Sequence, residues 1–368
     1  MGAPADLVAR LAPGERVYLP GSAAEVIGLA EALAGGPALR ITTTYVPGIN
    51  PLPLAGLPHG TVVRSPFAYG AAQAGGSFAH LPLSYGAFVG HLRDTAFDTA
   101  IVQVAPPDAD GRCSLGPAVE FTPLALPHAR RVIGVLNPHM PRMPRSADIP
   151  FHTFDSVLEV DAPLREYDVG APSGVASAIA RHVAVFIEDG AALQIGLGKV
   201  PDALLRMLTD RRRLHLFSGM LSDGTRLLAE AGALAPGAAH TSCVHVGTAG
   251  YYDWLAGRGE FSVRDCGHTH AMGVLAALPR LVAVNTALSV DLFGQANLEM
   301  LDGREVSGVG GAAEFSRGAV ASDGGISIIA LPASAGRADT PRIVPRLDGI
   351  CSLPRQDVQV VESGRAHV

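Results

Sequence analysis

The residues best suited to chemistry in this 368-residue chain lie in two glycine-rich turns. In the first, Gly196 and Gly198 separate an apolar run from a segment with helical character, and Lys199, the only lysine of the chain, follows directly. Glycines let the backbone approach a ligand closely, and the amides at a helix N-terminus attract negative charge. The turn therefore predicts a site for an anionic group, although a tight turn without a ligand has the same pattern.

The second turn covers residues 307–315, which read S-G-V-G-G-A-A-E-F. It contains Gly308 and the adjacent pair Gly310 and Gly311. Adjacent glycines allow positive φ angles and can bring backbone amides against a ligand. The alternative is a bulge or turn in a sheet with no ligand.

These turns, with a third segment, resemble the acetyl-CoA hydrolase/CoA-transferase family, in particular the 4-hydroxybutyrate and acetate CoA-transferases. The segments resemble the family patterns G-[IL]-G-x-x-P-D-A within residues 195–203 (beginning at 196), H-[ST]-E-M-x-S-D-G within 216–224 (beginning at 217) and S-G-V-G-G-x-x-[DE]-F at 307–315. Further matches occur in the same order at residues 104–116, 136–142 and 291–299. The resemblance implies a CoA-transferase fold, coenzyme A as part of the substrate and no permanently bound cofactor.

Two departures from the family pattern fall on its chemistry. In the family, the Glu of the second segment is the nucleophile that takes up the acyl group and then the CoA, whereas this chain has Gly219 there. Glycine has no side chain, so no acyl-glutamyl anhydride can form at that position. Residues 265–270, D-C-G-H-T-H, align with the family's D-Y-[VT]-N-[ND]-P, which places His268 where relatives carry an Asn that faces the Glu.

The departures predict an enzyme that uses water in place of the missing carboxylate. Hydrolysis of an acyl-CoA thioester is the first hypothesis, and hydrolytic C–C cleavage of a β-keto-type CoA ester is the second. A catalytically silent protein that binds CoA esters is the alternative from a different class. In each case the resemblance assigns the CoA ester to Gly196, Gly198, Lys199, Gly308, Gly310 and Gly311.

Hydrolysis requires a group that accepts a proton from water, and three side chains are candidates. Imidazole, with an ordinary pKa of about 6.5, is mostly in its accepting form at neutral pH, which favours His268 beside the gap at Gly219. Glu120 and Glu299 are the rivals, because the resemblance places both near the pocket. The alternative for His268 is a structural role in the turn at Gly267.

The elements that must position these residues alternate between strands and helices. Apolar runs predict strands at residues 191–195, 214–217, 280–285 and 326–330, and residues 202–208 predict a helix. This alternation, with its glycine turns, predicts an α/β protein with two open, mostly parallel α/β domains. Because the pattern restarts near residues 165–185, we expect an N-terminal domain over residues 1–175 and a C-terminal domain over residues 176–368.

The composition limits the partners and the compartment. A formal charge of −6 provides no basic surface for nucleic acid. The four cysteines have no C-x-x-C spacing and the histidines no H-x-x-x-H spacing, so we expect free thiols and no metal site. Residues 1–10 lack a signal-peptide pattern, and no apolar run approaches the roughly 18–20 residues of a membrane helix. We expect a cytoplasmic homodimer that binds no membrane.

Overall fold

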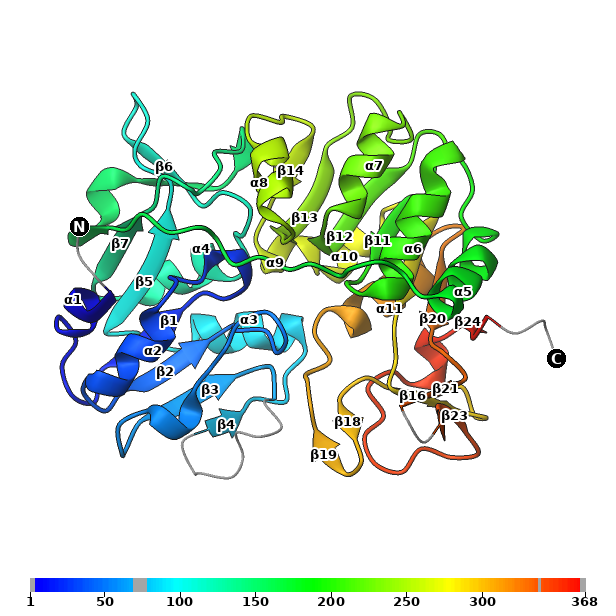
Figure 1. Cartoon of the computed structure of the whole chain (residues 1–368), viewed down its shortest axis with the longest axis horizontal. Coiled ribbons are helices and arrows are strands. Elements are labelled where there is room, and N and C mark those ends of the chain that lie inside the picture. The colour runs from blue at the N-terminus through cyan, green and yellow to red at the C-terminus, as the bar shows by residue number, and fades with distance from the viewer. Residues whose placement is uncertain (1–3, 69–77, 337–338, 365–368) are drawn as a thin grey trace. The chain divides into compact units, whose positions relative to one another are not determined.

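The computed structural model describes residues 4–68, 78–336 and 339–364, which form two compact units (Figure 1). Unit 1 contains residues 1–167 and 243–267, and unit 2 contains residues 168–242 and 268–368. The sequence predicted a single domain boundary after residue 175, whereas in the structure residues 243–267 belong to the first unit. This return of the chain to unit 1 depends on the pairing of β14 (Phe261–Val263) with β8 (Arg145–Ser146), which lies far earlier in the chain and leaves no local sequence signal.

Unit 1 is built on a seven-stranded sheet with the order β10-β7-β5-β1-β2-β3-β4. Every strand pairs with its neighbours in parallel. The strands are β1 (Arg16–Leu19), β2 (Arg40–Thr43), β3 (Val62–Ser65), β4 (Phe78–His80), β5 (Thr99–Val104), β7 (Val132–Leu136) and β10 (Ser156–Glu159). Its helices are α1 (Pro4–Val8), α2 (Leu29–Ala32), α3 (Tyr85–Arg93), α4 (Thr122–Ala125) and α8 (Ala249–Leu255), and β6 (Arg112–Ser114) pairs with β9 (Asp148–Pro150).

Unit 2 contains the parallel strands β24-β20-β15-β11-β12, in that order across the sheet. They are β11 (Ala192–Ile195), β12 (His215–Leu221), β15 (Leu281–Asn285), β20 (Ile326–Ala330) and β24 (Val360–Glu362). Next to β12 comes β13 (His240–His245), which begins in unit 2 and ends in unit 1. These parallel sheets with helices between successive strands confirm the predicted α/β class.

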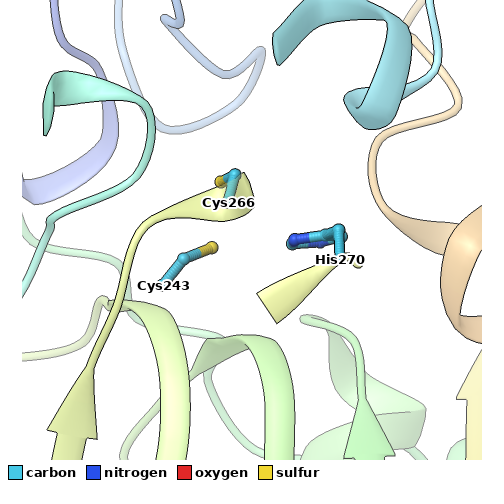
Figure 2. Close-up of side chains that lie close together, drawn as sticks. All are labelled: Cys243, Cys266 and His270. Carbon is cyan, nitrogen blue, oxygen red and sulfur yellow. The ribbon is translucent and has the colours of Figure 1, made fainter. Parts of the chain in front are cut away.

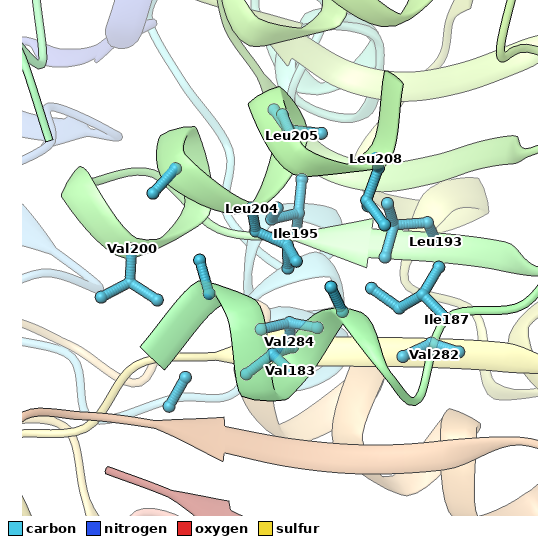
Figure 3. Close-up of a cluster of buried hydrophobic side chains, with 14 of the residues drawn as sticks. Val183, Ile187, Leu193, Ile195, Val200, Leu204, Leu205, Leu208, Val282 and Val284 are labelled. Atoms are coloured by element: carbon cyan, nitrogen blue, oxygen red, sulfur yellow. The ribbon is translucent and has the colours of Figure 1, made fainter. Parts of the chain in front are cut away.

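Helices cover both faces of the unit 2 sheet. Successive residues of a strand point to opposite faces, so each face has its own set of packing contacts. On one face, Leu193 and Ile195 pack with residues of α5 (Gly174–Ala184), α6 (Lys199–Met207) and α7 (Gly224–Glu230), as Figure 3 shows for part of this cluster. On the other face, Ala192 and Phe217 pack with α10 (Met272–Ala276) and α11 (Ala312–Ala321). A sheet buried on both faces explains why its strands are continuous apolar runs in the sequence.

The remaining elements of the second half are short. The helix α9 (Cys266–Thr269) crosses from unit 1 into unit 2. Small pairings join β16 (Ser289–Asp291) to β17 (Ala296–Asn297) and β23 (Ile343–Val344), β18 (Met300–Leu301) to β19 (Arg304–Glu305), and β21 (Ser334–Ala335) to β22 (Thr340–Pro341). Within the described residues, no helix combines the length and the apolar character needed to cross a bilayer.

Candidate active site

The first glycine turn lies at the carboxyl end of β11 and leads into α6. Gly198 precedes the helix with φ of 124°, a conformation that side chains rarely adopt, while a Cβ atom at Gly196 would meet nothing within 4 Å. Lys199 is exposed at the start of the helix. The carboxylate of Asp202 accepts a hydrogen bond from Arg206 Nε over 2.7 Å. The backbone at Gly196–Gly198 thus presents an open turn at the sheet edge where parallel α/β proteins bind ligands.

Strand β12 continues past residue 217, where the sequence predicted its end, and Gly219 is therefore part of the strand. The hydroxyl of Ser218 explains the extension, because it joins β12 to the end of β11. Its Oγ donates to the carbonyl of Ile195 over 2.7 Å and accepts from the Ile195 amide over 3.3 Å. Ser218 therefore fixes the backbone of Gly219 beside the first glycine turn.

A side chain at Gly219 would point toward two aromatic rings of unit 2. Its Cβ atom would lie 3.3 Å from His270 Nε2 and 3.6 Å from Cε2 of Phe315. A separation of 3.3 Å is tighter than ordinary van der Waals contact, so the imidazole already borders the space that a side chain would enter. Gly219 itself is half-buried.

His270 was not among the site residues predicted from the sequence, but the structure places it beside Gly219. Its side chain is buried, and its Nδ1 lies 2.9 Å from Thr269 Oγ1. The ring meets Phe315 edge to face, with centroids 4.9 Å apart. A Cβ atom at Gly311 would lie 2.2 Å from His270 Nε2, so glycine is required there for the ring to occupy this position. The sequence signal that points to His270 is the second histidine of the H-T-H segment.

The predicted general base His268 lies on α9 and is half-buried. Its ring centroid is 6.3 Å from that of Phe217, with the planes tilted by 50°. Because Phe217 and Gly219 are two residues apart on a strand, they face the same side of the sheet. The two histidine rings therefore lie next to neighbouring positions on one face of β12: His268 is beside Phe217, and His270 is beside Gly219.

Glu299, one of the rival bases, lies between β17 and β18 and is buried. Its carboxylate accepts a hydrogen bond from Ser352 Oγ over 2.6 Å, and its backbone amide donates to Asn297 Oδ1 over 3.0 Å. These contacts hold Glu299 in the loop and small-strand region after β15. Its part in catalysis stays a prediction.

In the second glycine turn, Gly310 has φ of 58°, the left-handed conformation that adjacent glycines were expected to allow. Gly311 forms the N-cap of α11 and accepts a hydrogen bond from the Phe315 amide over 3.1 Å. Gly308, two residues before Gly310, is buried. The turn thus places Gly311 against His270, on the same ring edge that faces Gly219.

Glu120, the other rival base, belongs to unit 1 and is buried with φ of 44°. Burial raises the pKa of its carboxyl above the ordinary value, whereas hydrogen bonds from the Ser22 and Thr44 hydroxyls and the Gly21 amide oppose the rise. Thr44 Oγ1 donates to Glu120 Oε2 over 2.8 Å. A buried carboxyl with a raised pKa holds a proton more readily than an exposed one.

The backbone of Glu120 forms hydrogen bonds with the backbone of two cysteines of the same unit. Its amide donates to the Cys243 carbonyl over 3.2 Å, and its carbonyl accepts from the Cys266 amide over 2.8 Å. The two sulfur atoms lie within 4.8 Å of each other, and Figure 2 shows both side chains. Burial and the hydrogen bond with Cys243 raise the pKa of the Cys266 thiol. None of the four cysteines, all of which lie in the described residues, forms a disulfide.

Comparison with known protein families matches two separate parts of the chain. Residues 77–164 match the model of the acetyl-CoA hydrolase/transferase N-terminal domain. Residues 247–368 match the model of the acetyl-CoA hydrolase/transferase C-terminal domain.

Individual relatives are similar over most of this chain. A 4-hydroxybutyrate coenzyme A transferase of Clostridium kluyveri is 35% identical over 282 residues, which are 74% of this chain and 66% of that relative. The chain thus spans just under two thirds of its length. The structure of RipA from Yersinia pestis is similar with a TM-score of 0.89 at 27% identity, over 98% of this chain and 88% of that one. A 4-hydroxybutyrate CoA-transferase structure from Porphyromonas gingivalis has a TM-score of 0.79 at 26% identity, over 99% and 88%.

Proposed function

The chain belongs to the acetyl-CoA hydrolase/transferase family, and on that premise we propose that it hydrolyses an acyl-CoA thioester by direct attack of water. Coenzyme A is then part of the substrate and not a resident cofactor. The open turn at Gly196–Gly198 supports an anionic ligand of this kind, because it meets the N-terminus of α6 at the carboxyl edge of the sheet. We assign the substrate to this turn and to the turn at Gly310 and Gly311.

The observation that carries the proposal is Gly219 on β12. Resemblance to the family puts a nucleophilic glutamate at this position, and a glycine cannot form an acyl-enzyme or a CoA-enzyme intermediate. Gly219 is held beside the first glycine turn by Ser218, so the backbone is still directed at the place where the substrate is assigned. Removing the carboxylate while keeping this placement closes the route of group transfer and favours water as the nucleophile.

The proposed reaction needs no further reagent. The oxygen of water bonds to the thioester carbonyl carbon, and the carbonyl oxygen becomes an oxyanion. Backbone amides of the turn at Gly310 and Gly311 are assigned to stabilise this charge. The C–S bond then breaks, the thiolate of CoA takes up the proton that water lost, and the products are a carboxylic acid and CoA.

The proposal is tested by searching for a covalent intermediate during turnover. The protein is incubated with acetyl-CoA and other acyl-CoA esters, treated with borohydride, and measured by intact mass, while released CoA is followed with a thiol reagent. We expect thiol release with an unmodified protein mass. Acyl exchange with free carboxylates, or a mass increase from an acyl or CoA adduct on any residue, contradicts direct attack by water.

Product analysis separates the remaining alternatives. Hydrolytic C–C cleavage of a β-keto-type CoA ester leaves CoA esterified to one of two fragments, so it gives a new CoA ester without a free thiol. A silent binding protein gives neither product, although it still binds the ester. Mass analysis of the products from a panel of straight-chain and β-keto CoA esters therefore identifies the reaction class.

A further inference from the structure

The position of His270 relative to two glycines carries an inference that rests on the proposed function. We propose that His270 is the catalytic residue that removes the proton from the attacking water, through Nε2. This nitrogen lies 3.3 Å from the Cβ position of Gly219 and 2.2 Å from the Cβ position of Gly311. Apart from atoms of the adjoining residues, it is the heavy atom nearest to the Cβ position of Gly219.

The sequence pattern supports a linked exchange of side chains between residues 219 and 270. By the alignment of residues 265–270 with the family pattern, position 270 is a proline in relatives, and position 219 is a glutamate. In this chain the first has become histidine and the second glycine. The structure shows that the two positions adjoin, because a side chain starting from Gly219 points at the His270 ring. A functional group has thus been lost at one position and gained at its neighbour.

The orientation of the ring assigns different roles to its two nitrogens. Nδ1 lies 2.9 Å from Thr269 Oγ1, and Thr269 is fully buried. When Nδ1–H donates to this hydroxyl, Nε2 carries a lone pair and can accept a proton. The edge-to-face contact with Phe315 and the backbone at Gly311 hold the ring in this orientation. Thr269 is therefore a positioning residue, and His270 is the group that reacts.

The proton balance of the step is complete without another reagent. As the water oxygen bonds to the acyl carbon, one water proton moves to Nε2 of His270. When the C–S bond breaks, the same proton moves from Nε2 to the sulfur of CoA. The imidazole returns to its starting tautomer, and Nδ1–H stays hydrogen-bonded to Thr269 Oγ1 throughout.

The neighbouring histidine provides a matched control. His268→Gln and His270→Gln change the same side chain two residues apart, and both rings lie on the same face of β12. We expect His270→Gln to lower kcat for acyl-CoA hydrolysis by about 10²-fold or more with little change in KM, and His268→Gln to lower kcat at least about tenfold less than His270→Gln does. In His270→Ala, added imidazole should restore part of the lost rate in proportion to its concentration.

Each outcome of these measurements decides the inference. If His270→Gln keeps kcat within about threefold of the wild type, or if His268→Gln alone shows the large loss, the assignment to His270 is overturned and hydrolysis itself stands. If the wild type hydrolyses none of the esters tested, the proposed function fails. In that case ¹⁵N NMR of the imidazoles, with His270→Gln to identify the signal, tests the placement in the folded wild-type protein. A shift of the His270 Nε2 signal on addition of acetyl-CoA supports His270 at the ester site, and no shift contradicts it.

Discussion

Replacing Gly311 by alanine tests the site geometry with the smallest possible change, one methyl group. Its Cβ would lie 2.2 Å from Nε2 and 2.5 Å from Cδ2 of His270, whereas ordinary van der Waals contact begins near 3.4 Å. The ring must therefore retreat by about 1.2 Å, or the turn must move by as much. The backbone at Gly311 has φ of −89°, which alanine adopts without strain, so the effect of the substitution is steric.

The magnitude of the effect follows from that displacement. Misplacing a catalytic group by about 1 Å can reduce the rate by about 10²-fold, so we expect a loss of this size in kcat for acyl-CoA hydrolysis. Overpacking a well-filled site costs roughly 1–3 kcal/mol, so the free energy of unfolding should also fall. Activity is measured by release of the CoA thiol, and stability by denaturant unfolding at the same pH.

Two other glycines separate the loss of activity from the loss of stability. In Gly318→Ala the new Cβ lies 2.5 Å from Leu275 Cβ, so it overpacks the same helix α11 at a site away from the His270 ring. In Gly273→Ala the new Cβ meets nothing within 4 Å. We expect both controls to keep most of the activity of the wild type. The reasoning is refuted if Gly311→Ala is fully active, or if Gly318→Ala loses as much activity for an equal loss of stability.

Two further predictions concern the missing carboxylate and a buried imidazole. Gly219→Glu should give little acyl exchange alone, because its Cβ is 3.3 Å from His270 Nε2, and the double variant with His270→Ala should exchange acetate into acetyl-CoA measurably faster. Equal exchange in the single and double variants would count against the steric coupling. His245 is fully buried, which lowers its pKa to about 3, so below pH 6.5 the unfolded chain binds a proton that the native chain does not. Stability should therefore fall by about 2 kcal/mol between pH 7 and pH 5, and His245→Phe should lose this part of the slope in urea unfolding. An unchanged slope in that variant contradicts the assignment.

The parallel strands of unit 2 were predictable because burial on both faces makes them continuous apolar runs. Residues 280–285 and 326–330 were predicted as strands, and the structure has β15 at Leu281–Asn285 and β20 at Ile326–Ala330. The glycine turn after β11 was predictable for a different reason, since a φ of 124° at residue 198 restricts the position to glycine. A backbone conformation that only glycine adopts readily can therefore be predicted from the sequence.

The extension of β12 was not predictable, because it depends on a contact between strands. Residues 218–221 are not an apolar run, and their extended backbone is held by the hydroxyl of Ser218 on Ile195, which belongs to the neighbouring strand. The return of residues 243–267 to unit 1 has the same cause, a pairing with residues far away in the chain. Sequence periodicity reports only which face of an element is apolar, not which neighbour it meets.

The choice between His268 and His270 shows where alignment stops being informative. Alignment places His268 opposite the missing carboxylate, but which side chain reaches residue 219 depends on the short helix α9 and on the turn that follows it. In the structure, the atom nearest to the Gly219 Cβ position belongs to His270. Only the three-dimensional path of the chain could show this, because both histidines are equally plausible as proton acceptors by residue type.

The geometry at Gly219, His270 and Gly311 is best explained as one arrangement with three dependent parts. The imidazole needs a glycine at 311, because any side chain there would overlap the ring, and it leaves room at 219 for no ordinary side chain without movement. A glutamate at 219 and this imidazole therefore fit together only if the ring or the backbone moves by a few tenths of an ångström. The proposed exchange replaces a carboxylate that forms a bond to the acyl carbon by a neighbouring imidazole suited to moving a proton, since neutral imidazole accepts protons well near pH 7. That difference is the physical reason to expect hydrolysis, and not CoA transfer, from a chain whose fold and turns are those of the family.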